Sequence, residues 1–235
     1  MIKKTLKAIS ILCILILSNF PTHANEMSKE KIEEIIENFL IQNPKLLRSV
    51  LDDYKKNIEL EKKRNAINAL YSLSNPGIFQ KNADITIFEF FDYNCGYCKS
   101  VVKTIMETIS EDKKINFVFV EFPILSQQSY TAALAALASQ KQNLYNKFHL
   151  SLMSIKGVVD DEKVFKVAKE IGLNIKQLKI DMNSSDISTQ LKKNREVAKL
   201  LNLNGTPAFI IEDVIYPGAL TKKNLKDIIK KVREN

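Results

Sequence analysis

Two cysteines three positions apart, Cys95 and Cys98, stand where the hydrophobic pattern of the chain changes. Before them, the apolar run at residues 85–91 has the length and composition of a buried β-strand. After them, apolar residues from Val101 to Ile109 recur at helical spacing. Cys95 is therefore predicted at the start of a helix, where unpaired backbone N–H groups and the helix dipole favour a thiolate over a thiol. Cys98 lies within reach of the first sulfur, so the pair forms a dithiol that can open and close.

The segments around this dithiol predict an α/β fold. Residues 115–122 form a second apolar run, which ends at Pro123, and a strand–helix–strand unit with a long crossover implies a parallel pair. Two short strands at 208–211 and 214–216, separated by Glu212-Asp213, are predicted to form a hairpin. An all-helical block lies between the two strand pairs, so the order is βαβ, helical insertion, ββα. The predicted helices of this region lie at residues 96–110, 130–140, 144–153, 163–171, 175–182 and 187–201 and from about 221 onward.

The N-terminus has the pattern of a targeting segment. Lysines at positions 3, 4 and 7 precede an apolar stretch at residues 8–17, which is too short for a comfortable membrane span. Thr22-His23-Ala24 is a plausible cleavage site, so residues 1–24 are predicted to be a signal peptide. The alternative is an uncleaved membrane anchor. Leu12, which precedes Cys13, is not the small residue of a lipoprotein signal, so lipidation is not expected.

Cleavage after Ala24 makes the cysteine count informative. The chain has three cysteines, and only Cys95 and Cys98 remain in the exported protein. A bond that closes so short a loop stabilises a fold little, because the entropic gain grows with loop length. A chemical role for the two thiols therefore explains the pair better than a structural disulfide does.

A metal site is the main chemical alternative to redox exchange. A structural zinc site needs a second pair of ligands, and no second Cys-x-x-Cys occurs. His149 is the one histidine left after cleavage, so a site built from Cys95, Cys98 and His149 stays open as an alternative. Haem attachment would need a histidine at the position of Lys99. Redox exchange is preferred, with no metal and no cofactor expected.

The net charge of +8 does not indicate nucleic-acid binding. The lysines are spread along the whole chain and mixed with acidic residues, whereas a nucleic-acid interface favours a clustered basic face, often rich in arginine. No nucleic-acid partner is expected.

Two amphipathic helices are predicted ahead of the dithiol domain. Apolar residues recur at helical spacing from residue 32 to residue 40, and again from Leu46 to Ile58. Asn43 is predicted as the N-cap of the second helix, with Pro44 at its first position. These faces pack either on the domain itself or on other copies of the chain. The charged run at residues 59–65 favours a solvated connector, so self-association through residues 28–60 is preferred.

Two separated motifs, taken together, resemble a known family. The first is Glu89-Phe-Phe-Asp-Tyr-Asn-Cys-Gly-Tyr-Cys98, and the second is Gly205-Thr-Pro-Ala-Phe209. They resemble the DsbA-like thioredoxin-fold oxidoreductases. The closest branch is the one with the suppressor-of-copper-sensitivity C protein and DsbG-like periplasmic disulfide isomerases. Residues 121–125 and 43–47 resemble the same branch, so the likeness covers nearly the whole mature chain.

The resemblance implies a domain organisation. It predicts a thioredoxin fold with a central mixed β-sheet and an inserted helical domain, preceded by amphipathic oligomerisation helices. The boundaries predicted on this basis are residues 1–24 for the signal peptide, 25–74 for the N-terminal helical segment and 75–235 for the thioredoxin-fold domain. Residues 126–202 are the helical insertion.

Roles for the two cysteines and the dipeptide between them follow from chemistry and from the resemblance. Cys95 is expected to be the nucleophile, and Cys98 is expected to resolve the mixed disulfide. Gly96 and Tyr97 form the active-site dipeptide, which in the family tunes the stability of the thiolate. The strongest oxidants of the family carry a histidine there, so Tyr97 predicts a less oxidising dithiol.

Three further residues are assigned by the resemblance. Pro207 resembles the cis-proline of the family, which would present the Thr206 backbone to a substrate strand by β-augmentation. Glu89, six residues before Cys95, is expected to be buried below the active site. The family suggests that an acid there moves a proton to or from Cys98, and a buried carboxyl with a raised pKa suits that role.

The function predicted from these features is that of a periplasmic thiol-disulfide oxidoreductase, acting as an isomerase or reductase of protein disulfides. Its expected partners are exported proteins with cysteines, a membrane redox partner and further copies of itself. Association with the outer membrane stays open. The alternatives are a monomeric DsbA-type dithiol oxidase and a copper-handling or surface-associated binding protein, since soft metals favour thiolates.

Overall fold

The computed structural model describes residues 27–234 of the 235-residue chain. The predicted signal peptide, its cleavage site and Cys13 lie outside the described residues. The chain divides into two compact units, Met1–Asn57 and Ile58–Asn235. Within residues 27–234, no helix combines the length and the apolar composition needed to cross a membrane.

The first unit contains α2 (Lys29–Gln42) and the beginning of α3 (Pro44–Ser72), which continues into the second unit. Ser28 caps α2, because its hydroxyl accepts a hydrogen bond from a first-turn N–H at 3.4 Å. Helix α3 begins at Pro44 and the Asn43 carbonyl accepts the Leu47 N–H at 3.2 Å, so Asn43 occupies the predicted N-cap position, but its side chain does not cap α3. Its side-chain amide instead donates to the carbonyl of Phe39 at 2.8 Å, because the last carbonyls of α2 have no partner within the helix.

The apolar residues of this unit are exposed. No residue of α2 is buried within the described chain, although the helix carries an apolar stripe. The same holds for the first turns of α3. The exposed fractions lie between 37% and 68% for Ile32, Ile35, Ile36, Phe39, Leu40, Ile41, Leu46, Leu47, Val50, Leu51 and Tyr54.

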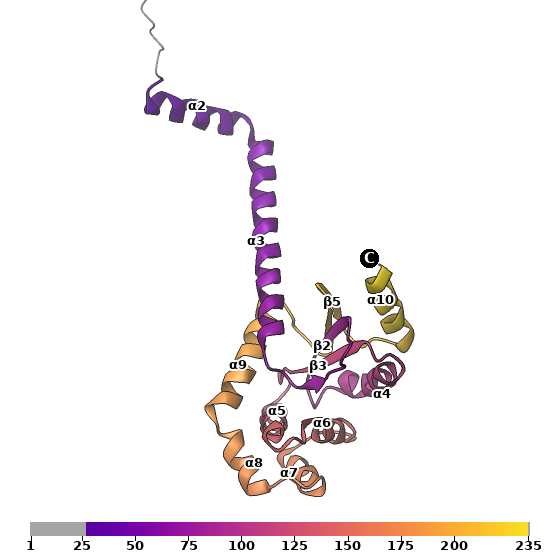
Figure 1. The fold of residues 1–235 in the computed structure, drawn as a ribbon. Coiled ribbons are helices and arrows are strands. Elements are labelled where there is room, and N and C mark those ends of the chain that lie inside the picture. Colours follow the sequence, from indigo (N-terminus) through magenta and orange to yellow (C-terminus); the bar gives the residue numbers. More distant parts are fainter. Residues whose placement is uncertain (1–26, 235) are drawn as a thin grey trace, which may run out of the picture. The chain divides into compact units, whose positions relative to one another are not determined.

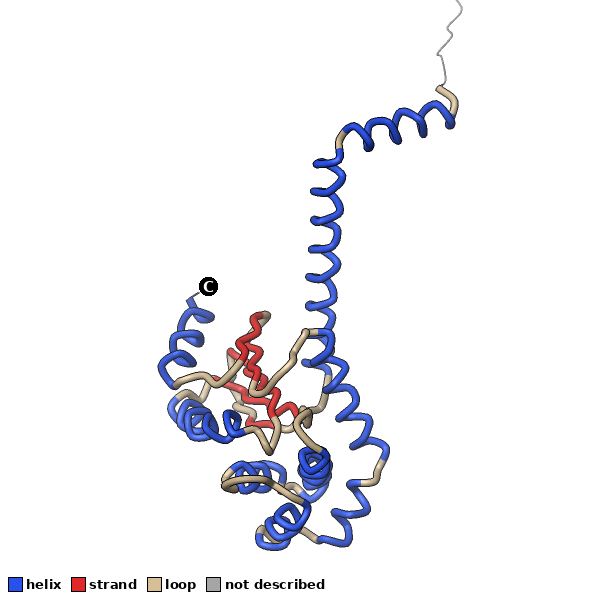
Figure 2. The backbone as a smooth tube through the Cα atoms, turned by 180° about the vertical axis from the view of Figure 1, so that it is seen from behind, coloured by secondary structure: helices blue, strands red, loops and turns tan. Residues whose placement is uncertain are grey.

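A five-stranded mixed sheet forms the centre of the second unit, drawn in red in Figure 2. The strand order is β1-β3-β2-β4-β5, with β2 parallel to β3 and every other neighbour antiparallel. The predicted parallel pair and hairpin are therefore confirmed. The strands are β1 (Gly77–Ile78), β2 (Ile85–Phe91), β3 (Ile115–Glu121), β4 (Ala208–Ile211) and β5 (Val214–Pro217).

Strand β1 is the one element of the sheet that the hydrophobic pattern does not predict. It has two residues, too few to show a period. A Cβ atom placed on Gly77 would lie 2.4 Å from the backbone oxygen of Phe117. Glycine is therefore required there for β1 to pair with β3 at the register Gly77–Val118.

Helices cover both faces of the sheet. The dithiol helix α4 and the C-terminal helix α10 lie beside it, and α5, α6 and α7 are grouped together (Figure 1). Helices α5 to α9 lie between β3 and β4, as the predicted element order requires. The helices of this unit are α4 (Gly96–Glu111), α5 (Gln127–Ser139), the short 3₁₀ helix η1 (Gln140–Gln142), α6 (Tyr145–Met153), α7 (Asp161–Glu170), α8 (Ile175–Met182), α9 (Ser185–Leu200) and α10 (Lys222–Glu234).

Alternation along the strands divides the core into two clusters. Residues Ile85, Ile87 and Phe91 of β2 pack with helices α4 to α10 in the larger cluster, which also contains both cysteines. Phe88 and Phe90 point to the other face and pack with the ends of α3 and α9 in the smaller cluster. The last turns of α3 are thus part of the core of the second unit.

Candidate active site

Cys95 occupies the N-cap of α4, directly after β2. Its backbone is extended, with φ −81° and ψ 114°, and its Sγ accepts a hydrogen bond from the Cys98 N–H at 3.3 Å. Helix α4 has 16 residues and no acidic residue in its first turn, so no carboxylate there offsets the positive end of the helix dipole. The predicted position of Cys95 at the helix start is confirmed.

Cys98 lies deeper than Cys95. The exposed fraction is 6% for Cys95 and 0% for Cys98, and both are free cysteines in this structure. Burial raises the pKa of the Cys98 thiol, and the negative charge of Glu89 raises it further. The disulfide between the two sulfurs stays a prediction.

Glu89 is buried in β2, as predicted. The exposed fraction of this residue is 1%, and its Oε1 atom has no hydrogen-bond partner among the described residues. Burial raises the pKa of the carboxyl well above its usual range, and the charge of Cys95 acts in the same direction. Glu89 is two residues from Ile87 and from Phe91, so alternation directs it to the face that carries the cysteines. A proton can therefore be held close to Cys98 and out of contact with water.

The segment before β4 lies against the first sulfur. The Thr206–Pro207 peptide bond is cis, as predicted. The Cys95 thiol donates a hydrogen bond to the Thr206 carbonyl at 3.2 Å. Within residues 27–234, the backbone N–H groups of Asn204, Gly205 and Thr206 donate no hydrogen bond. This edge beside the nucleophile is therefore free to pair with another extended chain.

Gly96 and Tyr97 form the outer surface of the dithiol loop. Tyr97 is 71% exposed. A Cβ atom at Gly96 would meet no heavy atom within 4 Å. The surroundings of the dipeptide thus leave room for other side chains, so packing does not require glycine and tyrosine at these two positions.

Asp92 organises the turn between β2 and α4, a role that the sequence analysis missed. Its Oδ1 accepts the Asn94 N–H at 2.7 Å, and its Oδ2 accepts the N–H groups of Ile124 and Leu125 at 2.9 and 3.0 Å. Its carbonyl accepts the Cys95 N–H at 3.0 Å. The signal was present as Asp-x-Asn, a sequence typical of turns in which the side chain binds the backbone two residues on.

Two residues next to the cysteines hold the loop between α6 and α7. The Asn94 amide oxygen accepts the Val159 N–H at 2.6 Å, and its Nδ2 donates to the Val159 carbonyl at 3.2 Å. The Lys99 ammonium donates to the carbonyls of Ile155 and Gly157 at 2.9 and 2.7 Å. The helical insertion is thereby fixed to the dithiol loop on both sides of the cysteines.

A second buried carboxyl, Glu121 at the end of β3, was also missed. Its Oε1 accepts hydrogen bonds from the hydroxyls of Tyr93 and Tyr145 at 2.9 and 2.8 Å. The Tyr93 hydroxyl also lies 3.1 Å from Nδ1 of His149. Burial raises the pKa of Glu121 and lowers that of His149 to about 3. This cluster joins the dithiol turn, the sheet and α6 inside the core.

The alternative metal site is not assembled in this structure. His149 is in the core beside Tyr93, and no group of three or more histidine, cysteine or acidic side chains within residues 27–234 is placed to hold a metal ion.

Comparisons with known proteins agree with this geometry. The family model described as thioredoxin matches residues 76–231. The crystal structure of a thioredoxin-like oxidoreductase from Silicibacter pomeroyi is 33% identical, covers 72% of this chain and 98% of its own, and has a TM-score of 0.69. The catalytic domain of Proteus mirabilis ScsC is 27% identical, covers 73% and 96%, and has a TM-score of 0.66.

A curated relative points to the same chemistry. It is the probable disulfide bond formation protein D of Bacillus anthracis, which is 24% identical over 163 residues, or 63% of this chain and 75% of that protein. The predicted thioredoxin fold and the likeness to the branch that contains ScsC are confirmed. With well over half of its length matched by the family model, this chain belongs to the thioredoxin family, as a DsbA-like thiol-disulfide oxidoreductase.

Proposed function

We propose that this protein rearranges and reduces disulfides in exported proteins, with Cys95 as the nucleophile and Cys98 as the resolving thiol. The observation that carries the proposal is the difference between the two sulfurs. Cys95 caps α4 beside the free backbone edge at Thr206 and is 6% exposed, whereas Cys98 is completely buried. A substrate can therefore reach the first sulfur, while the second reaches only the first.

The reaction begins with attack of the Cys95 thiolate on one sulfur of a substrate disulfide. The substrate S–S bond breaks, the other sulfur leaves as a thiolate, and a mixed disulfide joins Cys95 to the substrate. If another substrate thiolate then attacks, Cys95 is released and the substrate is rearranged without net electron transfer. If Cys98 attacks instead, the Cys95–Cys98 disulfide forms and the substrate is reduced by two electrons.

Glu89 is proposed to handle the proton of Cys98. Cys98 must lose a proton before it attacks, and burial holds its thiol in the neutral form. The Glu89 carboxyl is buried on the same face, with one oxygen unpartnered among the described residues and its pKa raised by burial. In its ionised form the Glu89 carboxylate is a stronger base than an ordinary one and accepts that proton, and in its neutral form it returns a proton to Cys98 when the reaction runs in reverse.

The segment 204–206 is proposed to bind the substrate as an added β-strand. Its backbone N–H groups have no partner among the described residues, and the Thr206 carbonyl faces Cys95. Main-chain hydrogen bonds of this kind do not depend on side chains. The surface thus accepts many cysteine-containing sequences.

Tyr97 supports a reducing rather than an oxidising role. An imidazolium beside Cys95 would stabilise the thiolate and so favour the dithiol form. The exposed phenol of Tyr97 supplies no such charge. Tyr97→His is expected to raise the reduction potential of the dithiol, measured against glutathione. An unchanged or lower potential would contradict this reasoning.

Refolding of a protein with scrambled disulfides tests the main proposal. The protein comprising residues 25–235 should restore activity to the scrambled substrate, and Cys95→Ser should abolish this. Cys98→Ser should retain rearrangement when an external thiol is present but lose the two-electron reduction of substrate. Refolding that survives Cys95→Ser would reject the proposal. A reduced substrate that the protein oxidises rapidly, with no rearrangement, would favour the dithiol oxidase.

Self-association through residues 28–60 is part of the proposal. Its support is the apolar stripe of α2 and of the first turns of α3, which is exposed in the single chain. Ile35→Asp with Leu47→Asp should lower the solution mass to that of one chain. Asn38→Asp with Ser49→Asp adds the same charge at polar positions and should leave the mass unchanged. A wild-type mass of one chain would reject self-association.

We also propose that residues 1–24 direct the protein to the periplasm, where a membrane redox partner would keep the dithiol reduced. The support is the pattern of lysines, apolar core and small residues at the N-terminus. N-terminal sequencing of the protein from a periplasmic fraction should begin at Asn25. Recovery of the intact chain in the membrane fraction would favour an uncleaved anchor.

A further inference from the structure

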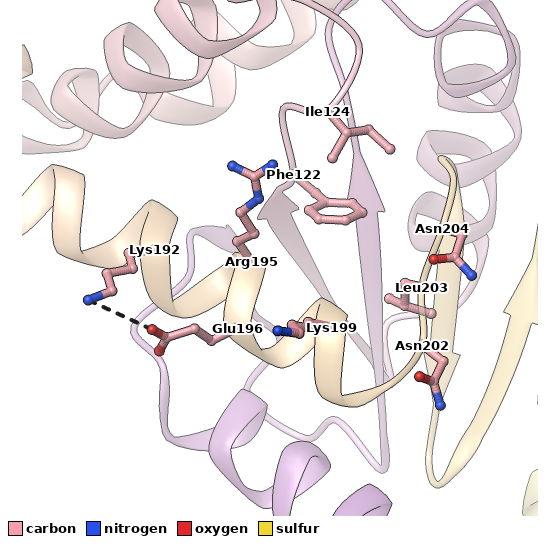
Figure 3. Close-up of a pocket in the computed structure, with 9 residues that line it drawn as sticks. All are labelled: Phe122, Ile124, Lys192, Arg195, Glu196, Lys199, Asn202, Leu203 and Asn204. Carbon is pink, nitrogen blue, oxygen red and sulfur yellow. Dashed lines mark ion pairs between the residues drawn. The ribbon is translucent and has the colours of Figure 1, made fainter.

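A cleft opens between α9 and two loops of the second unit. It measures about 700 Å³ and is shown in Figure 3. One loop follows β3 and supplies Phe122 and Ile124, and the other precedes β4 and supplies Leu203 with its two neighbouring asparagines. The volume is within the range of sites that bind small ligands or several side chains.

Cations line the α9 side of this cleft. Lys192, Arg195 and Lys199 all belong to it, with Glu196 as the one acidic residue. Glu196 forms an ion pair with Lys192 at 3.9 Å. Within residues 27–234, no carboxylate lies within 4.0 Å of the Arg195 or Lys199 side-chain nitrogens. The cleft therefore combines two unpaired positive charges with an apolar wall.

Figure 3 shows how these groups face each other. Arg195 extends from α9 towards Phe122 and Ile124. Phe122 and Leu203 are buried, whereas Arg195 and Lys199 are exposed. A guanidinium over an apolar surface binds a carboxylate in a bidentate manner and is less strongly hydrated than an ammonium. The arrangement thus favours a side chain with a short apolar part and a terminal carboxylate.

The cleft shares three lining residues with a hollow at the segment before β4. Asn202, Leu203 and Asn204 also line a second hollow, which contains Thr206 and Pro207. On the other side, the Ile124 N–H and the Cys95 N–H are both bound by Asp92. An extended chain advances about 3.3 Å per residue. Because Asn204 lines both hollows, a strand paired at residues 204–206 would pass beside the cleft.

We propose that this cleft binds acidic residues of the substrate close to its cysteine, through Arg195 and Lys199. The inference rests on the proposed function, because it assigns a substrate preference to the same site. Backbone pairing at residues 204–206 would accept any sequence, and the cleft would add a preference for glutamate or aspartate. The two unpaired cations make an acidic peptide segment the occupant that the charges favour.

Peptides with one cysteine held as a mixed disulfide with 2-thiopyridine provide the test. The Cys95 thiolate of the reduced protein attacks the peptide sulfur, the S–S bond to thiopyridine breaks, and 2-thiopyridone is released and measured by its absorbance. Cys98 then attacks Cys95 and frees the peptide thiol. One peptide has glutamate on both sides of the cysteine, and its partner has glutamine at the same positions.

The glutamate peptide is expected to react about three- to tenfold faster than the glutamine peptide at low salt, as two partly exposed ion pairs allow. This preference should decline as salt screens the charges. Arg195→Gln with Lys199→Gln should bring the ratio of the two rates close to one. Lys193→Gln with Lys231→Gln removes the same charge from exposed positions outside the cleft and should keep the ratio. Melting temperatures show whether each variant is folded.

Several results would overturn the inference. Equal Cys95-dependent rates for the two peptides would leave the proposed function intact and reject the acidic preference. An equal decrease of the ratio in both double variants would assign the preference to overall charge. Loss of the preference in inorganic phosphate at constant ionic strength would make the cleft a small-anion site instead. Absence of release from both peptides would reject the proposed function and this inference with it.

Discussion

His149 gives the sharpest prediction about stability, because it is a buried base in a protein with few histidines. The whole chain has two histidines, and the other, His23, belongs to the predicted signal peptide. The exposed fraction of His149 is 1%, and its ring lies 4.2 Å from the ring of Phe119, centroid to centroid. Burial lowers the pKa of His149 to about 3, from an ordinary value of 6.5.

The sign of the effect follows from proton binding. As the pH falls below 6.5, the unfolded chain protonates this histidine, whereas the folded protein keeps it neutral until about pH 3. The folded state therefore loses stability as the pH falls through that window. Between pH 7 and pH 5, protonation of this group stabilises the unfolded state by about 2 kcal/mol, because pH 5 lies about 1.5 units below the ordinary histidine pKa.

Urea unfolding of the reduced protein lacking residues 1–24, at pH 7 and pH 5, measures this contribution. His149→Gln removes the titration and also costs packing, so the variant should be less stable than wild type at pH 7. The difference in the free energy of unfolding between the two proteins should be about 2 kcal/mol smaller at pH 5 than at pH 7. The raised pKa values of Glu89 and Glu121 act in the opposite direction. Both proteins carry these carboxyls, so their contribution cancels in the comparison.

A gap that is the same at both pH values, within about 0.5 kcal/mol, would refute the reasoning. It would mean that His149 is protonated in the folded protein, or that it is exposed to water. A gap that widens at pH 5 would mean that protonation of His149 stabilises the fold. The expected narrowing therefore tests both its burial and its neutral state.

Three further substitutions test other parts of the structure. Glu89→Gln should gain stability relative to wild type as the pH rises above about 4.5, because the folded wild-type protein keeps the raised-pKa carboxyl neutral while the unfolded chain ionises it. Urea unfolding from pH 4 to pH 7 measures this, and a stability difference that stays constant with pH would contradict it. Asp92→Ala should cost about 2–4 kcal/mol, because three backbone N–H groups lose their acceptor; a loss below about 1 kcal/mol in urea unfolding would show that water replaces it. Arg233→Lys should cost about 1 kcal/mol, because the guanidinium binds Asp84 and Asp112 at 2.7 and 2.6 Å and an ammonium cannot bind both in the same way; an unchanged melting temperature would argue against that role.

Local sequence patterns were sufficient for most elements of the second unit. Strand β2 and helix α4 were predicted with the cysteines at their junction, because a strand period and a helical period meet there within a few residues. The parallel pair and the hairpin followed from connection length and turn residues. The identity of the dithiol as the reactive site followed from the cysteine count.

Resemblance to a known family extended this prediction to residues far from the cysteines. Thr206 and Pro207 are separated from Cys95 by more than a hundred positions, and no local period connects them. The structure brings the Thr206 carbonyl to 3.2 Å from the Cys95 sulfur. Burial of Glu89 followed both from alternation along β2 and from the resemblance, and it is observed.

Two local features depend on partners that a residue's neighbours in the chain do not specify. Asn43 has the composition of an N-cap and stands before a proline, yet its side chain reaches back to a carbonyl of the preceding helix. Strand β1 is too short to show a period, and it exists because β3 offers it an edge. In both cases the competing partner was a backbone group whose position the pattern does not specify.

The sequence by itself determined the dithiol, its place at a strand–helix junction and the order of the elements, because period, caps and turn residues are local properties. The tertiary structure decided what surrounds the dithiol. It brought Asp92 into hydrogen bonds with the segments on both sides of it in space, its own turn and the loop after β3. It also placed Glu121 between two tyrosines, and Arg195 and Lys199 beside an apolar wall. These groups come from segments far apart in the chain, and their charges and hydrogen bonds acquire a meaning only when the sheet and the helical insertion bring them together.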